Sequence, residues 1–291
     1  MKYYFIINPQ SGKTNKNHVE ENIHAACFKR EIPYEIIYTK YQGEAKEIAG
    51  RISDGEESVI FSVGGDGNLN EVLNGIVRSK NKILGNIPLG SANDFERSLR
   101  MNDSGIHWID LGTINGRYFI NVACVGLDAD VANNVSVIRK KKWIPVSQRY
   151  NASILYTFFG YQFKKMRIQM GETTVESECT ILAVCNGQYY GGGYRIAPHA
   201  LINDGMFDVY VVRKMPKPKI IPLLLKLIHG KHESSSLVKS YKDSKVIVDS
   251  DEKYTFNVDG EMITSNHFEL EIKKKAVRVF NDRSFIEEIL K

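Results

Sequence analysis

SVGGDGNLNEVLNG, from Ser62 to Gly75, places a glycine-rich turn between two regular elements. The apolar run before the turn, which begins at Ser58, is typical of a strand buried on both faces. The residues after it, Asn68–Val77, have the pattern of an amphipathic helix. In open α/β sheets ligands bind outside the carboxyl ends of the strands, and free amides at a helix start favour an anion. The turn therefore predicts a phosphate site, and the alternative is a tight strand-to-helix turn without a ligand.

Asp66, in the middle of this turn, needs an explanation of its own. A carboxylate beside a phosphate is repelled unless a cation lies between the two groups or the carboxylate binds something else. One carboxylate acting with substrate phosphates is the usual way in which Mg²⁺ is held beside a nucleotide triphosphate. Asp66 is therefore a candidate metal or nucleotide ligand, and the alternative is that it only caps the following helix.

Two further polar loops follow strand-like runs in the first third of the chain. NPQSG follows the first run, and GSANDF follows the fourth. Apolar runs and amphipathic segments alternate here, which indicates a parallel sheet covered by helices. Three loops that converge on one edge of such a sheet favour a nucleotide site more strongly than one loop does. The expected strands are Tyr3–Ile7, Tyr34–Tyr38, Ser58–Val63 and Ile83–Pro88, and the expected helices lie around Lys16–Lys29, Gly43–Ile52 and Asn68–Val77.

Two common phosphate-binding motifs are excluded by spacing. SGKT, at Ser11–Thr14, imitates the end of a P-loop, but the first glycine of that motif would fall at Ile7. The dinucleotide fingerprint fails because Asn70 stands where its third glycine belongs. The nucleotide site that the sequence predicts is therefore of another kind.

The pattern changes after about Asp110, where short β-branched runs and turn dipeptides replace the alternation. Such a pattern indicates antiparallel strands of a sandwich or barrel. The expected strands are Tyr118–Val125, Arg167–Met170, Thr180–Cys185, Phe207–Val212, Lys245–Val248, Tyr254–Val258 and Phe268–Ile272. The turn dipeptides are Asn115-Gly116, Asn186-Gly187, Asp204-Gly205 and Asp259-Gly260, and helices are expected at Gln148–Phe163, Pro218–Gly230 and Ser284–Lys291.

Composition places the chain among ordinary globular proteins. Of its 291 residues 43% are hydrophobic and 25% charged, and the net charge of +5 is too small for a nucleic-acid-binding arm but suits a protein that meets phosphates. The four cysteines are scattered, which argues against a zinc site or a disulfide framework. No apolar stretch approaches the length of a membrane span, so we expect a cytoplasmic protein that does not bind nucleic acid.

Three motifs in this order, NP-x-SG, GGDG-x-x-N-E-V-x-N-G and P-x-G-x-x-NDF-x-R, resemble the diacylglycerol kinase catalytic family of bacterial lipid kinases. The resemblance continues through DLGTINGRYFINVACVG, APHALINDGMFDVYVV and NVDGE, and so spans nearly the whole chain. It implies an α/β nucleotide-binding domain similar to NAD kinases and phosphofructokinases, followed by a β-sandwich. We expect the first domain over residues 1–125, the lipid-substrate domain over 126–280, and a C-terminal helical segment over 281–291.

The resemblance also implies the site residues, with ATP and Mg²⁺ as cofactors. Glu261 would accept the proton of the lipid hydroxyl, and Asp66 would act with it in catalysis. A loop similar to the family's structural Mg²⁺ loop starts at Pro198, and its ligands would be the Asp204 side chain with the carbonyls of Leu201 and Met206. The ATP-binding residues would be Asn8, Pro9, Gln10, Ser11, Gly12, Thr39, Gly64, Gly65, Asp66, Gly67, Asn68, Leu69, Asn70 and Ser91.

Two departures from the family's usual pattern affect the nucleotide site. Asn68 replaces the threonine of GGDGT, and Ser91 replaces another threonine. Both remain good helix N-terminal residues and phosphate donors, so we expect activity to survive with altered nucleotide affinity. The alternatives are an NAD kinase, which shares GGDG, and a non-catalytic nucleotide- or lipid-binding module.

The lipid itself is left open by the sequence. Diacylglycerol, a sphingoid-like alcohol and a phosphatidylglycerol headgroup all present a hydroxyl group. The basic run Arg139–Pro145 carries a tryptophan and suits an anionic membrane surface, where the protein would bind peripherally, or else it is a solvated loop. Whether the chain forms a homodimer is also open.

Overall fold

The computed structural model describes residues 1–11, 16–99, 104–126 and 163–291. Within these ranges the chain forms two compact units, residues 1–111 with 273–291, and residues 112–272. Almost all of the expected helix Gln148–Phe163, and the whole basic run Arg139–Pro145, lie outside the described residues. No helix in the described part is long and apolar enough to span a membrane.

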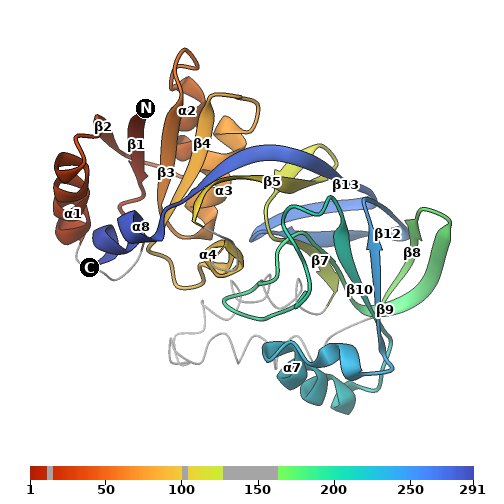
Figure 1. Ribbon diagram of the computed structural model, residues 1–291. Helices are drawn as coiled ribbons and strands as arrows, with labels where there is room; N and C mark the ends of the chain where they lie inside the picture. Colours follow the sequence, from red (N-terminus) through yellow and green to blue (C-terminus); the bar gives the residue numbers. More distant parts are fainter. Residues whose placement is uncertain (12–15, 100–103, 127–162) are drawn as a thin grey trace. The chain divides into compact units, whose positions relative to one another are not determined.

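The first unit contains a parallel sheet with helices packed on it. Its strand order is β2-β1-β3-β4-β13, and each neighbouring pair runs parallel. Every residue of β3 is buried, as its continuous apolar run predicts. Figure 1 shows α1 beside α8, and α2 beside α3. The elements are β1 (Lys2–Ile7), α1 (Lys16–Lys29), β2 (Tyr34–Tyr38), α2 (Glu44–Arg51), β3 (Ser58–Gly64), α3 (Asp66–Ile76), β4 (Lys82–Pro88), α4 (Asp94–Leu99), the start of β5 (Gly105–Ile114), the end of β13 (Glu261–Asn281) and α8 (Arg283–Leu290).

The end of the chain completes the core of the first unit. Phe5 and Phe61 stack with their ring centroids 4.7 Å apart. Phe280 packs edge-on against Phe61 and against Phe285, which is tilted against the stacked pair, and all four rings are buried. Because β13 is one continuous strand, it leads the chain from the second unit back to β4. The division falls after Leu111, whereas the sequence suggested residue 125.

The second unit is built from antiparallel strands. Alternate residues of its strands face two cores: Ala123 and Val125 of β7 lie in one, and Val122 and Cys124 lie in the other. The elements are β6 (Arg117–Phe119), β7 (Val122–Gly126), β8 (Lys164–Met170), β9 (Thr173–Cys185), β10 (Phe207–Arg213), η2 (Lys217–Lys219), α7 (Ile220–Ile228), η3 (His232–Ser234), β11 (Val238–Asp243), β12 (Lys245–Val258) and most of β13.

Three sequence-based strand assignments in this unit were wrong. Tyr118–Val125 is two strands, because β6 pairs with β5 while β7 pairs with β9 and β12. Lys245–Val248 and Tyr254–Val258 are one strand, β12, which pairs with β13 on both sides of a register shift. The shift lies in a polar stretch, so hydrophobicity alone suggested a break there.

Candidate functional site

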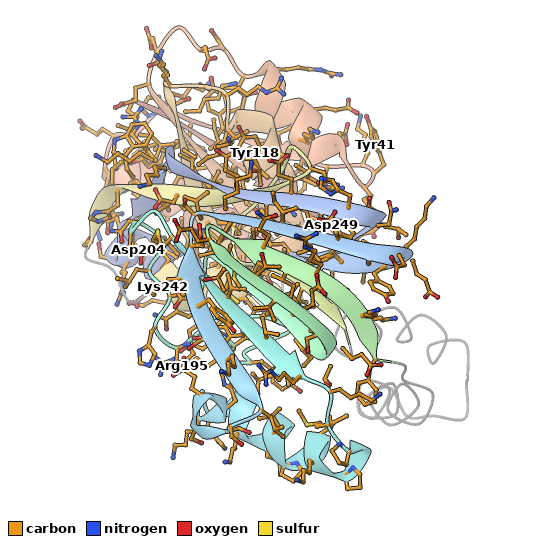
Figure 2. The ribbon with its side chains drawn as sticks, turned by 90° about the vertical axis from the view of Figure 1, so that its right-hand side faces the viewer. Tyr41, Tyr118, Arg195, Asp204, Lys242 and Asp249 are labelled. Carbon is orange, nitrogen blue, oxygen red and sulfur yellow. The ribbon has the colours of Figure 1, made fainter. Side chains whose placement is uncertain are left out.

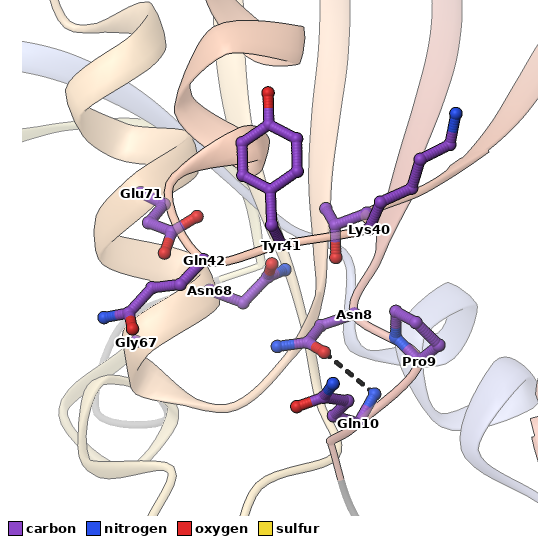
Figure 3. Close-up of a pocket in the computed structure, with 10 residues that line it drawn as sticks. Asn8, Pro9, Gln10, Lys40, Tyr41, Gln42, Gly67, Asn68 and Glu71 are labelled. Carbon is purple, nitrogen blue, oxygen red and sulfur yellow. Dashed lines mark hydrogen bonds between the residues drawn. The ribbon is translucent and has the colours of Figure 1, made fainter.

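A pocket of about 270 Å³ opens in the first unit where β1 and β2 end and α3 begins (Figure 3). This position at the carboxyl ends of parallel strands is where α/β sheets bind ligands. Six of the predicted ATP-binding residues line it: Asn8, Pro9, Gln10, Thr39, Gly67 and Asn68. Four lining residues were not predicted: Lys40, Tyr41, Gln42 and Glu71.

The unpredicted residues belong to the loop that follows β2 and to the helix facing it. The Glu71 carboxylate accepts a hydrogen bond from the amide of Gly43 at 2.8 Å, which fixes the loop against α3. Tyr41 is 55% exposed at the pocket. Of this loop, only Thr39 is predicted from the sequence. The signal that could have found the others is their place after a parallel strand, at the same edge as the glycine turn.

The three glycines of the turn are required for different reasons. A Cβ on Gly64 would lie 2.9 Å from the Cβ of Asn68, so packing within the unit explains Gly64. A Cβ on Gly65 would lie 3.2 Å from the Cα of Gly90, in the loop after β4. A Cβ on Gly67 would meet nothing within 4 Å, and Gly67 is exposed and lines the pocket. Packing therefore does not explain Gly67, and the open space beside it leaves room for a ligand to approach the backbone closely.

Helix α3 directs its amino-terminal end toward this pocket. Its first residues follow Gly65 directly. The first hydrogen bond of the helix runs from the amide of Leu69 to the carbonyl of Gly65, at 3.1 Å. Helix geometry leaves the amides before Leu69 without partners inside the helix. Together with the helix dipole these amides favour an anion, such as a phosphate.

The Asn68 side chain points into the fold. Its Nδ2 donates to the carbonyl of Ile6 at 3.2 Å and to the hydroxyl of Ser62 at 2.9 Å, and the residue is only 6% exposed. The side-chain amide thus ties α3 to β1 and β3. The expectation that this side chain serves as a phosphate donor is therefore not supported by its contacts, and its contribution to an anion site would come from the backbone amide.

Replacing Asn68 with alanine should lower the free energy of unfolding by about 1–3 kcal/mol, because buried oxygens lose their donor. Urea denaturation measures the difference. Ser91→Ala is the control, since Ser91 is exposed and stability should not change. If Asn68→Ala stays within about 0.5 kcal/mol of the parent, the range of ordinary surface substitutions, the inward amide does not have this role.

Asp66 connects the glycine turn to α4. Its Oδ1 accepts a hydrogen bond from the amide of Asp94 at 3.0 Å, at the start of that helix. Burial raises the pKa of Asp66, and backbone amides of residues 93–95 act in the opposite direction. The side chain therefore caps α4, whereas α3, whose N-cap is Gly65, receives no side-chain cap. Because a carboxylate has several acceptor positions, this contact leaves Asp66 able to bind a cation.

The loop after β4 is closed by Asn93. Asn93 Oδ1 accepts from the amide of Gly90 at 3.0 Å, and its Nδ2 donates to the Gly90 carbonyl at 2.8 Å. The φ angle of Asn93 is 52°, a left-handed conformation that asparagine tolerates better than most residues. Ser91 is exposed inside this closed turn and is not among the residues lining the pocket.

The remaining predicted ATP-binding residues lie close to the turns already described. Ser11 donates its amide to the carbonyl of Asn8 at 3.1 Å, and the Asn8 side chain accepts from the amide of Gln10 at 2.9 Å. These bonds shape the loop after β1. Leu69 and Asn70 are buried in α3, and Gly12 lies outside the described residues.

Glu261 is the first residue of β13 in the second unit. It follows the two-residue turn Asp259-Gly260, whose φ angles of 47° and 92° both lie in the left-handed region. Such a turn is the tight hairpin that the sequence predicts. The Glu261 carboxylate forms an ion pair with Arg117, which itself follows the similar turn Asn115-Gly116.

Asp259 fixes this hairpin, a role that the turn dipeptide Asp259-Gly260 does not by itself predict. Its carboxylate accepts backbone amides of Ile120 at 2.6 Å, Asn121 at 3.2 Å and Val122 at 3.0 Å. The Asp259 amide in turn donates to the Val122 carbonyl at 3.1 Å. These contacts hold the connection between β6 and β7 against the turn that precedes Glu261. Asp259 therefore fixes the backbone of the turn that Glu261 follows.

In the loop that resembles a structural Mg²⁺ site, the Asp204 carboxylate contacts an amide and an ammonium group. Asp204 Oδ1 accepts the amide of Met206 at 3.0 Å, and Oδ2 lies 3.2 Å from the ammonium of Lys242. The described residues contain no group of three or more His, Cys, Asp or Glu side chains that could hold a metal. Leu201 is 54% exposed. Asp204 is the one carboxylate among the three predicted ligands, and because an ammonium already contacts it, these ligands do not fit a structural Mg²⁺ ion.

Two family models match the chain and together cover nearly all of it. The diacylglycerol kinase catalytic domain matches residues 2–119, and the YegS C-terminal NAD kinase beta sandwich-like domain matches residues 121–281. The chain belongs to the family defined by these two domains, a diacylglycerol kinase catalytic domain followed by a YegS C-terminal NAD kinase beta sandwich-like domain. By family it is a lipid kinase, as the motifs around GGDG and NDF predicted.

Relatives of this lipid kinase family align over most of the chain. A diacylglycerol kinase of Bacillus subtilis (strain 168) is 29% identical over 236 residues, which cover 77% of each protein. A diacylglycerol kinase of Staphylococcus epidermidis is 27% identical over 301 residues, covering 98% of this chain and 94% of the relative. The crystal structure of a diacylglycerol kinase from Bacillus anthracis superposes with a TM-score of 0.71 at 19% identity, covering 98% of both chains, and this likeness shows the fold.

Proposed function

We propose that this protein is an ATP- and Mg²⁺-dependent lipid kinase that transfers the γ-phosphate of ATP to a lipid hydroxyl group. The observation that carries the proposal is the pocket of the first unit, where Gly67 and the start of α3 lie at the carboxyl ends of parallel strands. Family membership supports phosphoryl transfer as the reaction.

The nucleotide phosphates would bind to the loop after β1 and to the amides that begin α3. Gly67 would let the backbone approach a phosphate closely, since no protein atom fills the space beside it. Asp66 would hold Mg²⁺ together with phosphate oxygens, and the metal would neutralise charge that develops during transfer. Burial beside this site strengthens the interaction of the Asp66 carboxylate with a cation.

Glu261 would act as the general base. In the proposed reaction the bond between the γ-phosphorus and the β–γ bridging oxygen would break and release ADP. A new bond would form from phosphorus to the lipid oxygen, and the hydroxyl proton would pass to the Glu261 carboxylate. An alcohol is a weak nucleophile, and a positioned base contributes about 10²–10⁴-fold. The ion pair with Arg117 and the turn anchored by Asp259 would keep the carboxylate in position.

The protein would bind peripherally to a membrane surface and would bind its lipid substrate there. Any acceptor must present a hydroxyl group at the level of the headgroups, because the base needs contact with that proton. Diacylglycerol is one such lipid, and mass analysis of the product identifies which hydroxyl-bearing lipid is used.

Replacing Gly67 with alanine should raise the KM for ATP about tenfold, equal to about 1.4 kcal/mol of binding free energy. The melting temperature should not fall, since the added methyl group meets no protein atom and alanine favours a helix. Steady-state kinetics and thermal unfolding measure the two effects.

Gly90→Ala is the matched control for this prediction. A Cβ there would lie 2.6 Å from the Cα of Gly65, so the variant should lose stability by about 1–3 kcal/mol through overpacking. An unchanged KM for ATP in Gly67→Ala would contradict phosphate binding at this turn.

Incubation with γ-labelled ATP, Mg²⁺, NAD and a mixed lipid extract tests the proposed function. Label in the organic phase supports a lipid kinase. Label on NAD would instead indicate the NAD kinase alternative. Nucleotide binding without any transfer would indicate a non-catalytic module, and either result would overturn the proposal.

A further inference from the structure

Lys242 lies between two carboxylates of the second unit. It stands on β11, directly opposite Asp208 of the antiparallel neighbour β10. Its Nζ is 3.2 Å from Asp204 Oδ2 and 3.4 Å from Asp208 Oδ2. Figure 2 labels Asp204 and Lys242, which lie close together. We call these three residues the Lys242 cluster.

The Lys242 cluster is partly shielded from water. The Asp208 side chain is only 6% exposed, and that of Asp204 is 23% exposed. A carboxylate removed from water needs a compensating charge. The ammonium of Lys242, 3.4 Å from Asp208 Oδ2, supplies a charge of the required sign.

Lys242 brings an ammonium group to this loop. Its Nζ lies between the two carboxylates, where the loop would otherwise need a cation. Because the lysine stem is about half exposed, the ammonium reaches the carboxylates from the solvent side of the strand.

A divalent cation and this ammonium compete for the same oxygen. Mg²⁺ requires oxygen ligands at about 2.0–2.1 Å in near-octahedral geometry. Asp204 Oδ2 is occupied by Lys242, and Oδ1 by the amide of Met206. Binding of Mg²⁺ would bring two cations together on one carboxylate, and their repulsion opposes it.

The rest of the loop is held by protein groups as well. The Gln188 side chain donates to the carbonyl of Ala200 at 3.0 Å. The Arg195 guanidinium donates to the carbonyl of Pro198 at 3.2 Å. The loop between β9 and β10 therefore has side-chain anchors upstream of Asp204 and an ammonium at Asp204 itself.

We propose that Lys242 replaces the structural Mg²⁺ of this loop, as a cation tethered to the neighbouring strand. The loop at Asp204 then folds without a divalent metal ion. The proposal concerns this loop alone and is independent of Mg²⁺ bound with a nucleotide, because the two sites lie in different units.

Thermal unfolding of the nucleotide-free protein tests the proposal. The melting temperature of the parent chain should be the same in millimolar Mg²⁺ and in EDTA. Lys242→Met keeps the length of the stem but removes the charge, so its melting temperature should fall by several degrees and should then rise when Mg²⁺ is added. Lys242→Arg should keep most of the stability and stay insensitive to Mg²⁺.

Lys239→Met is the matched control, because Lys239 is exposed on the same strand and forms no ion pair with the described part of the chain. It should leave the melting temperature unchanged. The proposal is overturned if Mg²⁺ stabilises the nucleotide-free parent and Asp204→Asn removes that stabilisation. It is also overturned if Lys242→Met melts like the parent. If Lys242→Met does not fold, the parent, Asp204→Asn and Lys242→Arg decide the question.

Discussion

Glu261→Gln should reduce turnover by about 10²–10⁴-fold, the usual contribution of a positioned general base. Glutamine keeps the shape of the side chain but cannot accept the hydroxyl proton. ATP affinity and melting temperature should barely change, because the Asp259 contacts that hold the hairpin do not involve the Glu261 carboxylate. Single-turnover kinetics with a saturating lipid substrate, together with nucleotide titration, measure both expectations.

Glu176→Gln provides the control for this variant. Glu176 also lies on a strand of the second unit and pairs with an arginine, Arg167, at 3.8 Å. Its loss should leave turnover unchanged. A Glu261→Gln variant that retains more than about a tenth of parental turnover, a difference of only ~1.4 kcal/mol in the barrier, would show that Glu261 is not the base.

Asp66→Asn should lower turnover by about 10²–10³-fold, as expected when one preorganised electrostatic contact is removed. Asparagine retains an oxygen that can accept the Asp94 amide, so α4 keeps its cap and the fold should be intact. Asp66→Ala should lose activity similarly and, in addition, about 1 kcal/mol of stability, because that cap is removed. The difference between the two variants in urea separates the structural part of the role from the catalytic part.

Saturating Mg²⁺ is the condition that decides the result for Asp66. A ligand of the metal or nucleotide cannot be replaced by a neutral amide without loss, even when the metal is abundant. Near-normal turnover of Asp66→Asn under that condition would leave Asp66 with its capping role alone.

The first unit could be predicted closely from the sequence. Both ends of α1 and of β2 were predicted correctly. The ends of β1, β3 and β4 were predicted to within one residue. Buried parallel strands are continuous apolar runs, and amphipathic helices separate them, so local sequence carries the information. The return of β13 and α8 to this unit has no local signal, because Phe280 and Phe285 find their partners at the opposite end of the chain.

Some features of the candidate site can likewise be predicted from local sequence, whereas others depend on residues that are far apart in the sequence. Gly67 of the glycine turn, the loop after β1 and Thr39 line one pocket, whereas the third predicted loop, which contains Ser91, does not line it. The direction of the Asn68 side chain depends on Ile6, far away in sequence, and could not be read locally. The contact of Lys242 with Asp204 depends in the same way on the pairing of β10 with β11.

The fate of the γ-phosphate is the most direct test of the proposed function. The purified protein is incubated with Mg²⁺, a mixed lipid extract and ATP that is labelled at either the γ- or the α-phosphate. The masses of the lipid products are then determined by mass spectrometry. We predict label in the organic phase from γ-labelled ATP alone, in a lipid heavier by one HPO₃ group, and about 10²–10⁴-fold slower labelling with Glu261→Gln. Absence of any phosphorylated lipid, while the protein binds ATP, would contradict the account.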